Sequence, residues 1–354
     1  MKQQRYVLLD GFRGLAALYV VLSHVGGQTF HGLQWGNLRV DFFFVLSGFV
    51  LQPRVPQRGM AAAEQARKFI RGRFFRLWPM LVTILLARLL IWGVWILRNP
   101  DLPSSAFGIV DFPTSFVAAL LLLQVVVPSA MEWGDPLWSL SAEWLTNLGV
   151  ALSGMIFGKF VWPFIFISGY ACLFMGSLSN TPVNLGFGAM GRALVGFSLG
   201  AIVRQLNDRY VRQFWLPRFA LACSLTLGIF AFQIVLHRSA LPVASLVLAF
   251  FVAEVVTVNQ DKIPALVLRS ATYLGSVSFG VYAWHNNFIK LISSGLLPIF
   301  PLNMGHQSVL EVVKISAVVV ALSIVATQAT AKFVEKPIQS RWSKKQAKTV
   351  TVAT

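Results

Sequence analysis

Ten long apolar runs dominate the chain, and this pattern leaves few folds open to it. They cover residues 8–26, 40–51, 77–97, 139–157, 160–177, 187–203, 219–236, 243–258, 272–291 and 309–331. A helix needs about 20 mainly apolar residues to cross the hydrocarbon core of a bilayer. The runs predict an all-α fold, a polytopic bundle of about ten transmembrane helices that occupies residues 1–335 as one domain. Residues 336–354 are expected to form a basic cytoplasmic tail that faces lipid headgroups.

An eleventh apolar segment, residues 116–127, is as short as the second run, 40–51, and counting it as a crossing would scramble the distribution of charge across the membrane. Pro128 ends it, so we expect a re-entrant or interfacial segment. Ten crossings put both termini on one side of the membrane. Most Lys and Arg residues of the loops then fall on that same side, as the positive-inside rule requires. Both termini are therefore predicted to be cytoplasmic.

The charge and cysteine content exclude several other classes of protein. The formal net charge is +17, which by itself would suit a nucleic-acid partner. The basic residues lie in alternate loops instead of forming one basic face, so no nucleic-acid partner is expected. The two cysteines, Cys172 and Cys223, both lie in apolar runs. They indicate neither a disulfide framework nor a metal cluster, and no metal site is predicted.

The first apolar run carries three ionisable residues, Asp10, Arg13 and His24. Charge at bilayer depth is costly and is kept mainly where it faces a protein interior or a wet cavity. On a helix, Arg13 and His24 differ by only about 20° around the axis and by about 16 Å along it. Asp10 falls about 40° from His24 on the same wheel. We expect this stripe to face one common cavity, although an arginine that snorkels and an interfacial histidine are the plain alternative.

A basic cluster precedes the third run. Arg71, Arg73 and Arg76 lie in the sequence RKFIRGRFFRLWP, and residues three apart are neighbours on a helix surface. The plain alternative is that these arginines follow the positive-inside rule, keep this end of the helix on the cytoplasmic side and have no further function. The functional interpretation is a clamp for phosphates, because a guanidinium fork matches phosphate oxygens two at a time.

Two further groups are candidates for chemistry. Ser139, Ser141 and Glu143 begin the fourth run and are expected at its outer end, near His24, where a Ser-based covalent step is conceivable. His285 lies in the middle of the ninth run, in the sequence YAWHNN. An intramembrane histidine is a functional candidate, and a hydrogen-bonded packing role is an equal alternative.

These segments together resemble the acyltransferase-3 family of integral membrane acyltransferases. The pieces that match are LDGFRGLAALYVVLSH, DFFFVLSGFVL, RFFRLWP, PLWSLSAEW, YLGSVSFGVYAWHN and VEKP. The resemblance implies that Arg13 and His24 match the family's Arg and His separated by ten residues, and that Arg73 and Arg76 match its Arg-x-x-Arg. Ser139, Ser141 and Glu143 match its Ser-rich motif. Many relatives carry an acidic or aromatic pattern after that Glu where this chain has Trp144-Leu145-Thr146, which leaves the acceptor side open.

The same resemblance implies an O-acyltransferase that moves an acyl group, often acetyl, from cytoplasmic acyl-CoA to a hydroxyl of a glycan or other acceptor. His24 would then act as general base, Arg71, Arg73 and Arg76 would hold the phosphates, and Asp10 or Glu143 would orient or balance these groups. Direct transfer and a route through an acylated residue both remain open. Acyl-CoA is a substrate, so no permanently bound cofactor is expected. A bacterial inner membrane is the expected location, and a transporter or flippase for a polar or anionic solute is the competing class.

Overall fold

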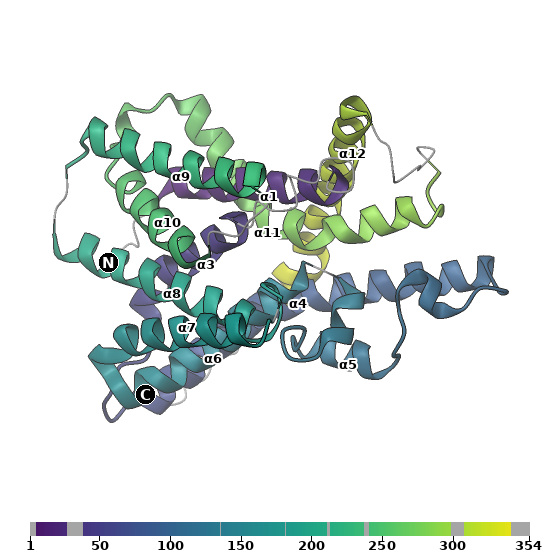
Figure 1. Ribbon diagram of the computed structural model, residues 1–354, viewed down its shortest axis with the longest axis horizontal. Coiled ribbons are helices and arrows are strands. Elements are labelled where there is room, and N and C mark those ends of the chain that lie inside the picture. Colours follow the sequence, from purple (N-terminus) through teal and green to yellow (C-terminus); the bar gives the residue numbers. More distant parts are fainter. Residues whose placement is uncertain are drawn as a thin grey trace.

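The computed structural model describes residues 5–26, 38–134, 136–180, 182–210, 213–236, 241–298 and 308–340, which form a bundle of helices (Figure 1). The long helices are α1 (Val7–Gly26), α3 (Leu38–Leu51), α4 (Ala62–Arg98), α6 (Leu137–Phe157), α7 (Val161–Leu178), α8 (Gly186–Arg209), α9 (Leu216–Leu236), α10 (Leu241–Val255), α11 (Ala265–Ser293) and α12 (Val309–Thr330). A π-helical turn, Ala331–Glu335, extends α12. No β-strand occurs in these described ranges.

Each of the ten apolar runs lies on a separate helix, so the all-α prediction is confirmed. Six stretches are long and apolar enough to cross a membrane. They are Val7–Gly26, Ala62–Arg98, Leu137–Leu178, Gly186–Arg209, Leu216–Gln233 and Val309–Ser340. The protein is therefore an integral membrane protein. The number of ten crossings stays a prediction, because α3 and α10 have only 14 and 15 residues. The cytoplasmic side of both termini depends on that number and stays a prediction too.

Helix α4 is longer than a bilayer needs. Its 37 residues span about 55 Å at the rise of an α-helix, against about 30 Å of hydrocarbon. The excess length is the N-terminal part, which carries Arg71, Arg73 and Arg76. One continuous helix, with Pro79 in its interior, therefore joins the basic cluster to the apolar half of the bundle.

The short apolar segment at 116–127 does not form a long helix. Helix α5 covers only Thr114–Leu120, and turns lead from it to a 3-10 helix at Pro128–Trp133. Ala119, Leu122 and Trp133 are fully buried against apolar residues of α4. Irregular backbone is tolerated at membrane depth where protein surrounds it. This packing also places the start of α6 in the interior of the bundle, beside the site described below.

Glycines let α1 and α11 pack unusually closely. A Cβ added at Gly14 would lie 2.5 Å from that of Leu274, and one added at Gly11 would lie 2.8 Å from that of Ala271. The two pairs share one residue offset of 260, so the helices run parallel in a fixed register. Small residues permit such backbone approach between membrane helices, where van der Waals packing drives association. The register decides which polar residues of α1 and α11 meet.

A buried ion pair joins α3 to α8. Arg192 Nε lies 2.8 Å from Asp41 Oδ1, and both side chains are 1% exposed. The Arg192 guanidinium also lies over the Trp138 ring, 5.1 Å from its centroid, at the start of α6. One cation therefore ties together three of the helices that surround the site described below.

We expect Gly14→Val to lower the stability of the fold by about 1–3 kcal/mol, because added methyl groups in a close-packed interface force the helices apart. Gly228→Val is the matched control, since nothing lies within 4 Å of a Cβ at that position on α9. Thermal unfolding of the purified protein in detergent measures both. Equal unfolding temperatures for the two variants would contradict the close α1–α11 packing.

We expect Arg192→Met to destabilise the protein by about 3–5 kcal/mol, because it leaves the Asp41 carboxylate buried without its counter-charge. Asp208→Asn is the control on the same helix, since Asp208 is half exposed and pairs with Arg204 only one turn away. Exposed pairs of that kind contribute at most about 1 kcal/mol. The unfolding temperature should fall for Arg192→Met alone, and an equally small effect of both changes would refute the structural role.

Candidate active site

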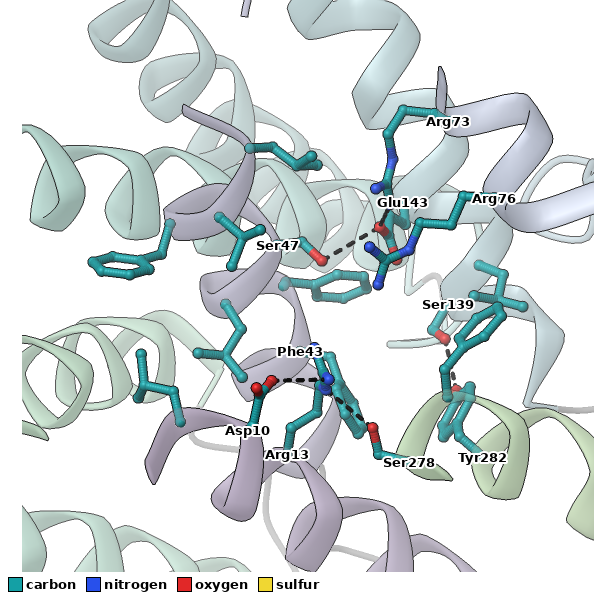
Figure 2. Close-up of a pocket in the computed structure, with 18 of the residues that line it drawn as sticks. Asp10, Arg13, Phe43, Ser47, Arg73, Arg76, Ser139, Glu143, Ser278 and Tyr282 are labelled. Carbon is teal, nitrogen blue, oxygen red and sulfur yellow. Dashed lines mark hydrogen bonds and ion pairs between the residues drawn. The ribbon is translucent and has the colours of Figure 1, made fainter. Parts of the chain in front are cut away.

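A cavity of about 310 Å³ lies between α1, α3, α4, α6, α8 and α11 (Figure 2). Its charged and polar lining residues are Arg5, Tyr6, Asp10, Arg13, Ser47, Arg73, Arg76, Ser139, Glu143, Arg204, Ser278 and Tyr282. Apolar and aromatic side chains, among them Phe43, Phe49 and Phe279, form the rest of the wall. Residues distributed from the beginning of the chain to α11 therefore converge on one hollow in the bundle.

On the α1 side, Asp10 lies between two arginines. Asp10 accepts from Arg5 Nε and pairs with Arg13 Nη2, each at 3.0 Å. Arg13 also donates to Ser278 Oγ at 2.9 Å and to the carbonyl of Gly275 at 2.7 Å, both on α11. Figure 2 shows the contacts from Asp10 through Arg13 to Ser278 along one side of the hollow. Arg13 is thus fixed in position while it lines the cavity.

On the opposite side, Glu143 of α6 binds Arg73 of α4. Arg73 Nη2 lies 2.6 Å from Glu143 Oε1, and Ser47 of α3 donates to the same oxygen at 3.3 Å. The sequence placed Glu143 at the outer end of its span and the basic cluster on the cytoplasmic side, and the expected separation of Glu143 from Arg73 is wrong. Residues 114–134 pack into the bundle before α6 begins, so the first turns of α6 lie at the depth of the arginines. The Nε of Arg73 is buried and has no partner in the described chain.

The predicted basic cluster divides between two surfaces. Arg76 lines the cavity beside Arg73, and no carboxylate of the described residues lies within ion-pair distance of it. Arg71 does not line this cavity. Its guanidinium lies 5.8 Å from the centroid of the Phe75 ring and borders a shallow hollow with Phe74 and Trp144. Of the three arginines predicted to clamp phosphate, two therefore meet at the site.

A hydrogen-bonded pair lines the cavity between α6 and α11. Ser139 Oγ and the Tyr282 hydroxyl are 2.6 Å apart, and that hydroxyl donates to the carbonyl of Pro136 at 2.7 Å. Ser141 points elsewhere, because its hydroxyl donates to the carbonyl of Leu122 and accepts from the Val125 amide. Ser141 therefore holds the turn after α5, and Ser139 is the serine that faces the hollow.

His24 is not among the residues that line this cavity, although Arg13 is. It lies near the end of α1 against His285 of α11, with ring centroids 5.0 Å apart. On α11, His285 comes one helical turn after Tyr282, and its Nδ1 lies 2.6 Å from the Tyr282 carbonyl. The stripe expected from the first run is thus split: Asp10 and Arg13 line the cavity, and His24 lies outside it, against His285.

Several residues of the site escape a reading of the sequence. Ser47, Ser278 and Tyr282 lie in apolar runs and belong to no ionisable cluster. Arg204 has the charge of an ordinary loop residue, although it lines the cavity with its guanidinium 5.4 Å from the centroid of the Phe49 ring. These side chains face the cavity because of the register in which their helices pack against neighbouring helices. The buried ion pair of Asp41 could have been expected from the sequence, because an acid inside an apolar helix needs a buried partner.

The lining gives the cavity an excess of positive charge, with five arginines and two carboxylates. A group of arginines, of which Arg73 is buried, suits an anion with several oxygens, and the aromatic wall suits an extended, partly apolar group. Within the described parts of the chain, no three His, Cys, Asp or Glu side chains gather into a possible metal site. The fold and site define an integral membrane protein with an arginine-rich cavity inside its helical bundle.

Comparison with known proteins identifies the family. A family model described as an acyltransferase domain matches residues 6–328, nearly the whole chain. The chain belongs to this acyltransferase-3 family, and the protein is a membrane acyltransferase. The resemblance drawn from its motifs is confirmed.

Two curated bacterial relatives match parts of the chain. "Protein 2 in picA locus" of Rhizobium radiobacter is 32% identical over 155 residues, which are 41% of this chain and 80% of that protein. "Acyltransferase MdmB" of Streptomyces mycarofaciens is 32% identical over 150 residues, which are 38% of this chain and 35% of that protein. No solved structure matches the chain.

Proposed function

We propose that the protein transfers a short acyl group, acetyl in the simplest case, from cytoplasmic acyl-CoA to a hydroxyl of a glycan or similar acceptor at the membrane. The observation that carries the proposal is the cavity itself, in which five arginines line a hollow walled by aromatic side chains. Membership of the acyltransferase family supports group transfer over solute transport. A bacterial inner membrane is the proposed location, because cytoplasmic acyl-CoA and cell-surface acceptors approach each other there.

The donor is proposed to bind by its phosphates. Acyl-CoA is a polyanion, and Arg76 together with the buried, unpartnered Nε of Arg73 offers guanidinium donors to its oxygens. Glu143 holds the Arg73 side chain in place before the donor arrives. The flexible arm and the acyl group would then extend past Phe43 toward Ser139 and Tyr282. In the proposed complex the acyl group would end beside the hydrogen bond between these two residues.

The chemistry is proposed to occur between the Tyr282 side of the cavity and His24, which does not line the resting cavity. His24 takes the proton of the acceptor hydroxyl, a C–O bond forms at the acyl carbon, and the C–S bond breaks with its electron pair on sulfur. The proton then passes from His24 to the thiolate. Arg13 stabilises negative charge on the acyl oxygen, which is a task for a fixed cation in a dry site. Tyr282 packs against Ala17 and Val20, which lie between Arg13 and His24 on α1, so its side chain must move aside during the reaction.

We expect His24→Ala to lower kcat by at least about 100-fold and to leave the binding of acetyl-CoA unchanged, because removing a general base affects only the chemical step.

We expect Arg73→Ala with Arg76→Ala to raise KM for acetyl-CoA at least about tenfold through the loss of phosphate contacts. The assay follows radiolabel from acetyl-CoA into base-labile esters of native membranes that contain the protein.

Arg98→Ala is the matched control, since Arg98 is an exposed arginine at the far end of α4. It should behave as the wild type. Full transfer by both the His24 and the arginine variants would exclude the proposal. Transfer that needs no thioester donor would exclude it as well.

A further inference from the structure

Arg88, in the apolar half of α4, is a buried cation without a counter-charge. The residue is 4% exposed, and its Nη1 lies 3.5 Å from the carbonyl of Asn286 on α11, which is a long contact. Its Nε is buried and has no hydrogen-bond partner in the described chain. The other arginines that are buried among the described residues, Arg73 and Arg192, each pair with a carboxylate. A buried charge is costly unless it is paired, so the fold alone gives no reason for Arg88.

A second cation, Lys290, lies beside Arg88. Lys290 comes one helical turn after Asn286 on α11, and Arg88 is near enough to repel its charge. The Nζ atom of Lys290 lies 4.3 Å from the centroid of the Phe107 ring, and no ion pair joins it to a carboxylate of the described residues. Two like charges repel, so an anion between them would turn this repulsion into attraction.

Two tryptophan N–H groups add to the excess of donors near Arg88. Trp92 comes one turn after Arg88 on α4, and Trp284 of α11 packs against apolar residues of α4. The Nε1 atoms of both tryptophans are buried and have no acceptor in the described chain. The Nε1 of Trp133, by contrast, donates to Ser115 Oγ at 2.8 Å. Because buried donors are normally paired, this part of the bundle is short of acceptors.

The two cations lie apart from the arginines proposed to hold the donor. Arg88 comes twelve residues after Arg76, which is about 18 Å along α4. On α11, Asn286 directly follows His285, whose ring lies against that of His24 with centroids 5.0 Å apart. Arg88 and its neighbour on α11 are therefore near the histidines and far from the proposed phosphate site of the donor.

We propose that Arg88 and Lys290 bind an oxyanion, a phosphate or carboxylate group that the acceptor carries in addition to its reactive hydroxyl. This inference rests on the proposed function, in which His24 takes the proton of that hydroxyl. The donor phosphates lie at the other end of α4, so an anion bound here belongs to the second substrate. Lys290 is half-buried and has a flexible side chain, which moves with the anion and brings it to the Arg88 guanidinium. The acceptor class is then an anionic glycan, or a glycan joined to its lipid through phosphate.

The binding test uses inorganic phosphate as the probe. The Arg73→Ala, Arg76→Ala protein is the background, because it lacks the proposed donor site. In an uncharged detergent at constant ionic strength, phosphate should raise the unfolding temperature of this protein, since a ligand that binds only the folded state stabilises it. Adding Arg88→Met should raise the phosphate concentration needed for the same shift at least about tenfold. Adding Arg98→Ala, at the exposed end of α4, should leave that concentration unchanged.

An equal response of these three proteins to phosphate, or no response of any of them, would overturn the inference. Lys290→Met is an independent variant in the same background. It should weaken the response about threefold, as the loss of one partly exposed charge contact does. An undiminished response of Lys290→Met would remove Lys290 from the site and contradict the proposal.

The unfolding temperature without phosphate separates this role from a structural one. Arg88→Met should not lower it, because methionine replaces a buried cation that has no carboxylate partner. Arg192→Met, which breaks a buried ion pair, should lower it. If Arg88→Met loses as much stability as Arg192→Met, or fails to fold, Arg88 belongs to the structure and the inference is wrong.

The source of the anion is decided in the acetyl-CoA assay with native membranes. Arg88→Met should lower acyl transfer at least about tenfold and leave KM for acetyl-CoA unchanged, because the lost contact is one to the acceptor. A bilayer phospholipid is the other source of phosphate. Native mass spectrometry that finds phosphatidylglycerol on the wild type and none on Arg88→Met, together with normal transfer by that variant, would assign the site to lipid and overturn the proposal.

The failure of this inference can be told from the failure of the proposed function. Full transfer by His24→Ala, beside a lost phosphate response in Arg88→Met, would refute the proposed function and leave the anion site in place. Full transfer by Arg88→Met, beside an inactive His24→Ala, would refute this inference alone.

Discussion

The close, parallel packing of α1 against α11 is the constraint on which the site depends. Gly11 and Gly14 remove the side chains that would keep the two backbones apart. The resulting register brings Arg13 to Ser278 and the carbonyl of Gly275 at one level, and His24 to His285 at another. Polar groups of the two helices therefore meet in pairs within a bundle whose other contacts are mainly apolar. A shift by one residue in this register would separate all of these pairs.

Charged residues inside the bundle fall into two groups, a buried ion pair and the residues that line the cavity. Arg192 and Asp41 are fully buried and matched, so they serve the structure. The cavity carries arginines in excess of carboxylates, and Arg73 keeps a buried donor without a partner. Removing one partner of a matched buried pair destabilises the fold, whereas arginines in excess of carboxylates around a hollow can bind an anion. This difference separates the structural ion pair from the proposed donor site.

The sequence predicts the helices and most of the charged residues of the site. Apolar runs are local, so the helix at each of the ten positions could be found from composition alone. Glu143 was misplaced because its depth depends on how residues 114–134 fold back into the bundle, and no local pattern encodes this. Tyr282 and Ser47 were missed because polar residues inside apolar runs become visible only when another helix faces them. His24 and Arg13 lie on one stripe as expected, yet Tyr282 from another helix divides that stripe.

The most direct test is a cryo-EM structure of the protein with a non-transferable acetyl-CoA analogue in which a methylene group replaces the thioester sulfur. The account predicts analogue phosphates beside Arg73 and Arg76, the arm along Phe43, and the acetyl group at the end of the cavity formed by Ser139 and Tyr282. Analogue density elsewhere on the protein, with this cavity empty, would contradict the account.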